Sequence, residues 1–174
     1  MALLKVRTWP DPVLKTPAKP VEGIDDSVRT LLRDMAETMY AQRGIGLAAQ
    51  QVGDLRRVLV IDVPGESEGD PGSGLIQAVN PRIVARSGRC KTTEGCLSFP
   101  GLEVDVERSY KVVVEWTDPD GTPRQRECEG LLAICFQHEM DHLDGIVFLD
   151  RVGLVRRRLA LKEYLARKAS EGTP

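Results

Sequence analysis

The sequence contains no long apolar run. The apolar stretch at its start stops at Lys5, which is too short for the core of a signal peptide. No segment approaches the roughly 18 apolar residues of a membrane span. An excess of one charge is also absent, because the formal net charge is only −2, so the composition does not indicate nucleic acid as the main partner. We therefore expect a cytoplasmic protein that binds neither a membrane nor DNA.

Histidine and cysteine are both rare, with two histidines and four cysteines in 174 residues. In a cytoplasmic chain, cysteines are more often free thiols or metal ligands than disulfide partners. The hydrophobic fraction of 41% and the charged fraction of 29% are ordinary for a globular protein. The length is sufficient for one domain with its own core. We expect a single domain over 1–174 in which 151–174 forms a basic C-terminal helix or tail.

Apolar periodicity predicts helices at both ends of a series of strands. Spacings of three and four predict helices over 25–42, 131–143 and 154–169. Runs of β-branched residues predict strands over 56–63, 75–86, 103–108, 110–118 and 124–130. Strands in succession with helices at the ends favour an α+β fold. We expect antiparallel or mixed sheets around the helix at 131–143, with an N-terminal and a C-terminal helix.

Glycine and proline mark the interruptions of this pattern. The segments 44–53 and 65–74 are rich in glycine and are predicted to be loops. Asn80 and Pro81 interrupt the strand predicted over 75–86, which indicates a bend or an edge strand.

The helix predicted over 131–143 carries the sequence HEMDH at 138–142, an H-E-x-x-H motif. On a helix, residues four apart share a face, so His138 and His142 can bind the same metal ion. Glu139 lies one position round the helix and can reach a water molecule at the metal without being a ligand itself. Leu131 and Ile134 share the histidine face, so we expect this face to be buried. Because the chain has no other histidine, we favour a metal site over two structural histidines.

A third ligand is needed, because catalytic metal sites usually take three protein ligands and leave one position open. The longer form of the motif would place a histidine at 148, where this chain has Phe148. We interpret Phe148 as ordinary packing. Glu163 is a candidate, as in zinc endopeptidases, although the basic residues around it indicate a solvated helix. The other candidates are the four cysteines: Cys90, Cys96, Cys128 and Cys135.

Cys96 is the strongest candidate among these. It lies in EGCLS between Gly95 and Leu97, and a glycine there lets the backbone approach an ion or a substrate. A thiolate with two imidazoles matches a known catalytic ligand set and suits zinc or ferrous iron. Cys135 would crowd three ligands onto one helix, and no motif supports Cys90 or Cys128.

Three segments together resemble the peptide deformylases, in the bacterial type that ends in a helix. They are GIGLAAQQ at 44–51, EGCLS at 94–98 and QHEMDHLDG at 137–145, in the family's order and approximate spacing. The resemblance implies Cys96, His138 and His142 as metal ligands and Glu139 as the general acid and base. It implies Gln51 and the backbone N–H of Leu97 as donors to a developing oxyanion.

The activity implied by this resemblance is hydrolysis of the formyl group from N-formylmethionyl peptides, with release of formate during N-terminal processing in protein biosynthesis. One divalent ion is implied, Fe²⁺ in the cell, for which Zn²⁺, Ni²⁺ or Co²⁺ can substitute. We expect the backbone of Gly46 to lie against the formamide. We expect the peptide to pair with Gly44 and Ile45 and with residues just after Leu97. Predicted linings for the methionine side chain are Ile45, Leu131, Ile134 and His138.

The sequence departs from some members of this family after C-L-S, where several carry an arginine. This chain has Glu103 there and Arg108 further on, so we assign no charged contact to the peptide. We expect Glu94 to support the metal site only indirectly.

The segment 151–174 holds seven Lys or Arg and two Asp or Glu. By the same resemblance, we expect it to contact ribosomal RNA near the exit site through Arg156, Arg157, Arg158 and Lys162. An apolar seam is predicted along Leu154, Leu161 and Leu165. Two alternatives to the deformylase remain open: a zinc endopeptidase that uses Glu163, and a ribosome- or peptide-binding protein with a structural metal.

Overall fold

The computed structural model describes residues 2–172, so Met1, Thr173 and Pro174, including the end of the predicted tail, lie outside the described residues. Strands β2 to β7 follow one another without a helix between them, and the α-helices lie before and after this series. The α-helices are α1 (Asp26–Ala41), α2 (Gly130–Leu143) and α3 (Leu154–Glu171), and the 3-10 helices are η1 (Pro12–Lys15), η2 (Ala49–Val52) and η3 (Phe148–Arg151). The strands are β1 (Gly46–Ala48), β2 (Val58–Ile61), β3 (Ile76–Ser87), β4 (Cys90–Cys96), β5 (Phe99–Arg108), β6 (Lys111–Thr117) and β7 (Pro123–Glu129).

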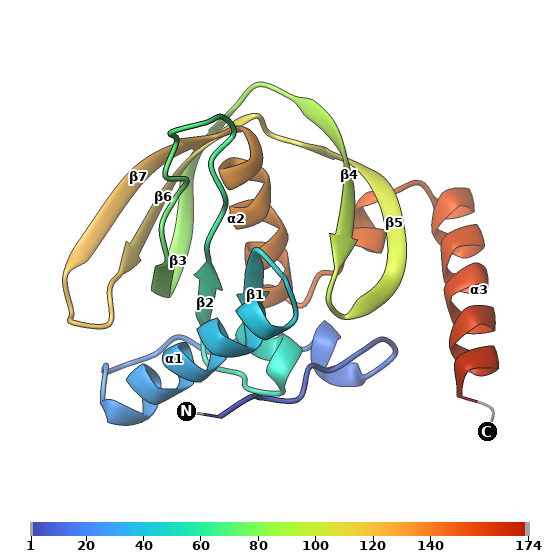
Figure 1. The fold of residues 1–174 in the computed structure, drawn as a ribbon, viewed down its shortest axis with the longest axis horizontal. Helices are drawn as coiled ribbons and strands as arrows, with labels where there is room; N and C mark the ends of the chain where they lie inside the picture. The colour runs from blue at the N-terminus through green and yellow to red at the C-terminus, as the bar shows by residue number, and fades with distance from the viewer. Residues whose placement is uncertain (1, 173–174) are drawn as a thin grey trace.

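The strands form two antiparallel sheets, which confirms the predicted α+β class. One sheet has the order β1-β2-β3-β6-β7, and β4 pairs with β5 in the other. The strands predicted over 103–108 and 110–118 therefore belong to different sheets. Helix α2 lies between the two sheets, and α1 runs below β1 and β2 (Figure 1). Within residues 2–172, no helix is long and apolar enough to cross a membrane.

Helix α2 is buried on nearly all sides because both sheets and the segment after it cover its surface. Eleven of its residues are buried, from Ala133 to Leu143 without a break. Ala133, Phe136 and Met140 pack in one cluster with side chains of β2, β3 and β6. The motif helix is therefore the centre of the molecule, and its polar side chains are held in a low-dielectric environment.

The N-terminal helix begins and ends where the sequence predicts. Asp25 caps α1 by accepting a hydrogen bond from the backbone N–H of Val28 at 3.1 Å. The buried face of α1 packs against β1 and β2 in a second cluster. The segment between α1 and β1 is thereby held at the edge of the five-stranded sheet.

Two predictions that were based on glycine and proline positions are wrong in part. The segment 44–53 is not one loop, because β1 pairs with β2 from Gly46 opposite Ile61, and η2 follows it. Its small apolar residues form a buried edge strand in spite of their glycines. The strand predicted over 75–86 is central in its sheet, and Asn80 and Pro81 fall at a shift of register between Val79 and Arg82. A bulge accommodates the missing N–H of Pro81 there.

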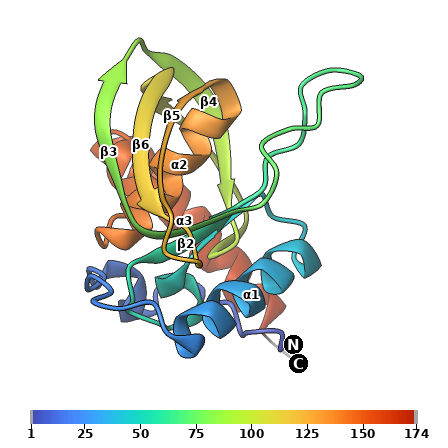
Figure 2. The same cartoon turned by 90° about the vertical axis from the view of Figure 1, so that its left-hand side faces the viewer.

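The loop predicted over 65–74 is found as turns and bends between β2 and β3. This segment extends away from the rest of the fold in Figure 2.

The C-terminal helix packs on the two-stranded sheet, at the edge of the molecule in Figure 1. Its buried contact is Tyr164, whose ring centroid lies 5.4 Å from the ring centroid of Phe99. The predicted leucine seam is wrong, because Leu154 is 61% exposed and Leu165 is 45% exposed. Only Leu161 of that seam packs against the hydrophobic cluster that contains Phe99 and Tyr164. Phe148 is buried in the same cluster, as the packing interpretation predicts.

Candidate active site

Cys96, His138 and His142 meet at one point, although the cysteine lies 46 residues before the second histidine. Their ligand atoms all lie within 4.8 Å of one another, and Cys96 Sγ is 3.3 Å from His142 Nε2. Helix α2 places the two histidines one turn apart, and β4 ends at Cys96 beside them. Among residues 2–172, these side chains form the group that could hold a metal ion.

The donor set fits a divalent metal of borderline softness. Nδ1 of His138 lies 2.8 Å from Oε1 of Glu94, so its N–H faces the carboxylate and Nε2 is the nitrogen left for a metal. Burial holds the pKa of His142 well below its ordinary value, so that imidazole is neutral. One thiolate and two imidazole nitrogens, which release their protons when a metal binds, suit zinc or ferrous iron.

A buried ion-pair network supports His138 from behind. Nε and Nη2 of Arg108 each donate to one oxygen of Glu94 at 2.8 Å, and Nη1 donates to Asp141 at 2.6 Å. The three side chains are between 4% and 9% exposed. Although burial raises it, hydrogen bonds from Arg108 and His138 lower the pKa of the Glu94 carboxyl to about 2. Glu94 is therefore a fixed anion against the histidine.

Glu139 lies on the same helix with its carboxylate in the cavity. It is 4% exposed, and within residues 2–172 its Oε2 has no hydrogen-bond partner. Burial raises the pKa of the Glu139 carboxyl to about 7. A carboxyl group in this state can both accept and release a proton near neutral pH.

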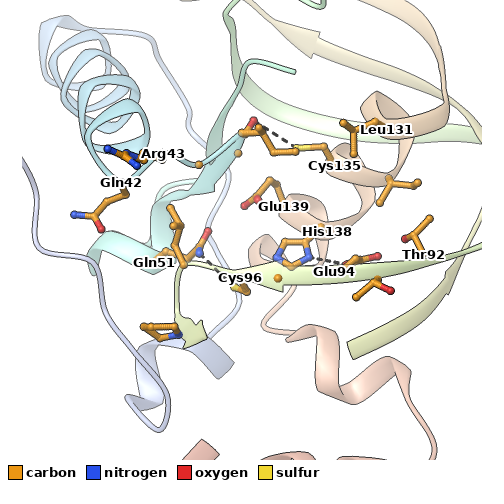
Figure 3. Close-up of a pocket in the computed structure, with 18 of the residues that line it drawn as sticks. Gln42, Arg43, Gln51, Thr92, Glu94, Cys96, Leu131, Cys135, His138 and Glu139 are labelled. Atoms are coloured by element: carbon orange, nitrogen blue, oxygen red, sulfur yellow. Dashed lines mark hydrogen bonds and ion pairs between the residues drawn. The ribbon is translucent and has the colours of Figure 1, made fainter. Parts of the chain in front are cut away.

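Gln51 is oriented by its own backbone neighbourhood. Its Oε1 accepts a hydrogen bond from the backbone N–H of Ala48 at 2.9 Å. The amide nitrogen is consequently turned toward Cys96 Sγ, at 3.7 Å, and Ser98 Oγ, at 3.2 Å. Figure 3 shows Gln51 and Cys96 on one side of the site, with His138 and Glu139 facing them. A donor is thus directed at the space beside the cysteine.

A cavity of about 580 Å³ opens onto these groups. Its wall includes Gln51, Cys96, His138 and Glu139 together with every residue predicted to bind the substrate. Those residues are Gly44, Ile45, Gly46, Leu97, Leu131 and Ile134. His142 lies behind this wall, with 1% of its surface exposed.

Gly46 has a packing reason for lacking a side chain, besides the predicted approach of a substrate. A Cβ at Gly46 would lie 2.7 Å from Oε1 of Glu139 and 2.8 Å from Sγ of Cys135. The glycine therefore keeps room for the carboxylate as well as for the cavity.

Glu163 does not join the histidines. It lies on α3, its side chain is 73% exposed, and it pairs with Arg167 at 4.0 Å. This is the surface ion pair that its basic surroundings indicate.

Sequence reasoning assigned no role to Arg108 or Asp141 and only an indirect one to Glu94. One local signal was available, because residues two apart on a strand share a face. Glu94 lies two residues before Cys96 on β4, so both side chains point to the same side. Arg108 and Asp141 carry no such signal, since the strand register and helix packing bring them to Glu94.

Comparison with known proteins agrees with this geometry. The family model described as polypeptide deformylase matches residues 3–158. A peptide deformylase of Alkalilimnicola ehrlichii is 45% identical over 158 residues, which cover 91% of this chain and 86% of that protein.

Solved structures agree as well. The crystal structure of a peptide deformylase from Legionella pneumophila matches with a TM-score of 0.88 and 41% identity, over 99% of this chain and 100% of that one. The peptide deformylase of Ehrlichia chaffeensis in complex with actinonin gives a TM-score of 0.91 and 40% identity, over 99% and 100% of the two chains. By sequence and by structure, the chain belongs to the polypeptide deformylase family and is an enzyme, a hydrolase of protein biosynthesis.

Proposed function

We propose that this chain removes the formyl group from N-formylmethionyl peptides by metal-dependent hydrolysis, with release of formate. The observation that carries the proposal is the meeting of Cys96, His138 and His142 beside the unpartnered carboxylate oxygen of Glu139. Family membership supports the reaction class. A structural metal site would be closed by four ligands and would need no such carboxylate.

Cys96, His138 and His142 would hold the metal. A divalent ion bound there supplies a Lewis acid that lowers the pKa of water and polarises the formyl oxygen. We propose Fe²⁺ as the ion in the cell, with Zn²⁺, Ni²⁺ or Co²⁺ as substitutes. Thiolate and imidazole donors are compatible with these ions.

Glu139 moves the proton in the proposed mechanism. Its Oε2 accepts a proton from the water that attacks the formyl carbon and then delivers it to the leaving amine. The buried carboxyl, whose pKa is near 7, suits both steps at neutral pH. Transfer by such a group is typically worth about 10²–10⁴-fold in rate.

Two donors would stabilise the formyl oxygen as it gains negative charge. One is the side-chain amide of Gln51, whose orientation Ala48 fixes. The other is the backbone N–H of Leu97. One donor of this kind contributes roughly 3–4 kcal/mol to the transition state.

The peptide would bind in extended form in the cavity. We propose that it lies between Gly44–Ile45 and the residues after Leu97, with the methionine side chain against Leu131 and Ile134. Strand β1 is at the edge of its sheet, so the backbone at its start, near Gly46, can pair with a further strand. The Ehrlichia chaffeensis relative was solved in complex with actinonin, which shows that a family member of this fold takes a ligand.

The decisive experiment is formate release from formyl-Met-Ala by anaerobically purified protein, with the metal content measured on the same sample. We expect stoichiometric metal and catalytic formate release. Metal-loaded protein that releases no formate would refute the proposal.

We also propose that α3 contacts ribosomal RNA by charge. Arg156, Arg158 and Lys162 are exposed there, whereas Arg157 pairs with Asp150 at 3.1 Å and contributes less than the sequence alone indicates. Cosedimentation with ribosomes should weaken with salt and after the exposed three are changed to glutamine. Undiminished cosedimentation of that triple variant would rule out this contact.

A further inference from the structure

Arg43 occupies a backbone position that usually belongs to glycine. It follows the C-cap of α1, and its φ is 57°. Two hydrogen bonds fix this turn: Arg43 N–H donates to the carbonyl of Tyr40 at 3.0 Å, and Gly44 N–H donates to that of Met39 at 2.9 Å. This is the Schellman pattern, in which the left-handed residue is commonly glycine because any Cβ is unfavourable there. A side chain retained at such a position calls for a functional reason.

Among the residues that the structure describes, the Arg43 side chain has no partner that would explain it. Within residues 2–172, its guanidinium makes no ion pair and no hydrogen bond, and the residue is exposed. Arg43 lines the active-site cavity beside Gln42 and Gly44, and it is the one arginine or lysine among the described residues of that wall. Figure 3 shows it where α1 ends, next to the strand that leads to Gln51. The mouth of the cavity thus carries one uncompensated positive charge.

The path of the peptide brings this charge to a defined part of the substrate. This placement of the peptide rests on the function proposed above, in which the formyl group lies near Gly46 and Glu139. A strand that pairs antiparallel with 44–46 advances about 3.3 Å per residue, as its partner does. Its second residue then lies beside Gly44, and its third comes next to the turn that holds Arg43. Carboxylates on the cavity wall do not offset the charge there, because Glu94 is bound to Arg108 and Glu139 lies beside the reacting group.

We infer that Arg43 is a specificity-determining residue that favours formylated peptides with an acidic side chain at the second or third position. The guanidinium attracts the carboxylate and repels lysine or arginine at the same place. Because the backbone of Arg43 is held in a fixed turn, its guanidinium moves over a smaller space, and less of this attraction is lost to motion.

The test compares amidated peptides, so that no terminal carboxylate competes. The substrates are formyl-Met-Ala-X-Ser-amide and formyl-Met-X-Ala-Ser-amide, with X as Glu, Gln or Lys, and kcat/KM is measured by formate release. At low salt we expect the wild type to prefer Glu over Lys by about two- to fivefold at one of the two positions, as an exposed ion pair allows. Arg43→Glu should reverse that order, and Arg43→Gly should abolish it. Higher salt should reduce the wild-type preference.

Two controls make the result specific. Arg158→Glu changes an exposed cation on α3, away from the cavity, and should keep the wild-type order. Arg43→Gly should unfold at the same temperature as the wild type or a higher one, because it relieves the left-handed turn. If the wild type releases formate from the Gln peptides but the Glu-to-Lys ratio is the same in Arg43→Glu, the inference is wrong and the proposed function stands. No formate from any peptide overturns both.

Discussion

Glu94 joins His138, a proposed metal ligand, to the protein framework, since its Oε1 accepts from Nδ1 of His138 at 2.8 Å while the carboxylate also pairs with Arg108. The hydrogen bond fixes the imidazole tautomer and leaves Nε2 free for the proposed ion. Because Arg108 also binds Asp141 of α2, the network ties β4 and β5 to the motif helix. The position of His138 relative to Cys96 thus depends on a buried charge cluster.

Replacement of Glu94 by glutamine should weaken metal binding. The amide keeps the shape but cannot serve both Arg108 and His138 as an anion, and the loss of such a partner typically costs about 10–100-fold in metal affinity. Competition with a chelator of known affinity measures the change. Glu107→Gln, on the neighbouring strand and 65% exposed, is the matched control and should bind as the wild type does. Equal affinity in both variants would contradict the role of Glu94.

Cys96→Ala and Glu163→Ala separate the two sets of proposed ligands. Removal of the thiol leaves two imidazoles, which do not complete a catalytic site, so we expect Cys96→Ala to lose its metal. Glu163 is exposed and pairs only weakly with Arg167, so Glu163→Ala should keep full metal content. Elemental analysis after gel filtration gives both values. A metal-free Glu163→Ala protein would instead favour the endopeptidase alternative.

Asp150 should make the free energy of unfolding depend on pH in the acid range. Although burial raises it, hydrogen bonds from Lys15 and from the backbone of Val147 hold the pKa of the Asp150 carboxyl below its ordinary value. A group with a lowered pKa in the folded state stabilises above its unfolded pKa, near 4, and this contribution is lost as pH falls through the folded pKa. Asp150→Asn should therefore lower the free energy of unfolding at pH 7 by about 1–3 kcal/mol.

As pH falls, the free energy of unfolding of Asp150→Asn should also decline less steeply than that of the wild type. Urea unfolding at pH 7, 5 and 3 measures both effects. Asp144→Asn, at a carboxyl group that is 52% exposed, is the control. Parallel pH curves for Asp150→Asn and the wild type would show that Asp150 does not supply this dependence.

The sequence predicted the histidine face of α2 because helical spacing acts within one element. Cys96 was selected among four cysteines by its glycine neighbour and by the motif around it, and it lies with the histidines. The Arg108 network could not be predicted in the same way. Arg108 reaches Glu94 across 14 residues and Asp141 across 33, and those contacts require the pairing of β4 with β5 to be known.

The C-terminal helix shows a second limit of sequence reasoning. Its periodicity correctly predicted a helix, but the leucines indicated the wrong buried face. Tyr164 is buried instead, because the receiving surface is an aromatic group formed by Phe99, Phe148 and Trp9. A helix of mixed composition is oriented by the surface that it packs on, and that surface comes from distant parts of the chain.

Gly46→Ala should damage catalysis more than folding. The added methyl group would meet Oε1 of Glu139 at 2.7 Å and Sγ of Cys135 at 2.8 Å, closer than real contacts allow. Overpacking of this kind typically costs about 1–3 kcal/mol of stability. Because the carboxylate is the side chain that can move, it should turn away from the position where it accepts a proton. Loss of that transfer predicts a fall in kcat of about 10²–10⁴-fold.

Steady-state kinetics on formyl-Met-Ala, with metal content and thermal unfolding on the same samples, separates these effects. Gly23→Ala is the matched control, since a Cβ there has nothing within 4 Å, and it should behave as the wild type does. If Gly46→Ala retained full kcat with bound metal, then Glu139 would tolerate displacement by the methyl group. Proton transfer would in that case have to be assigned to another group, because the proposed mechanism requires Oε2 of Glu139 to stay beside the reacting water.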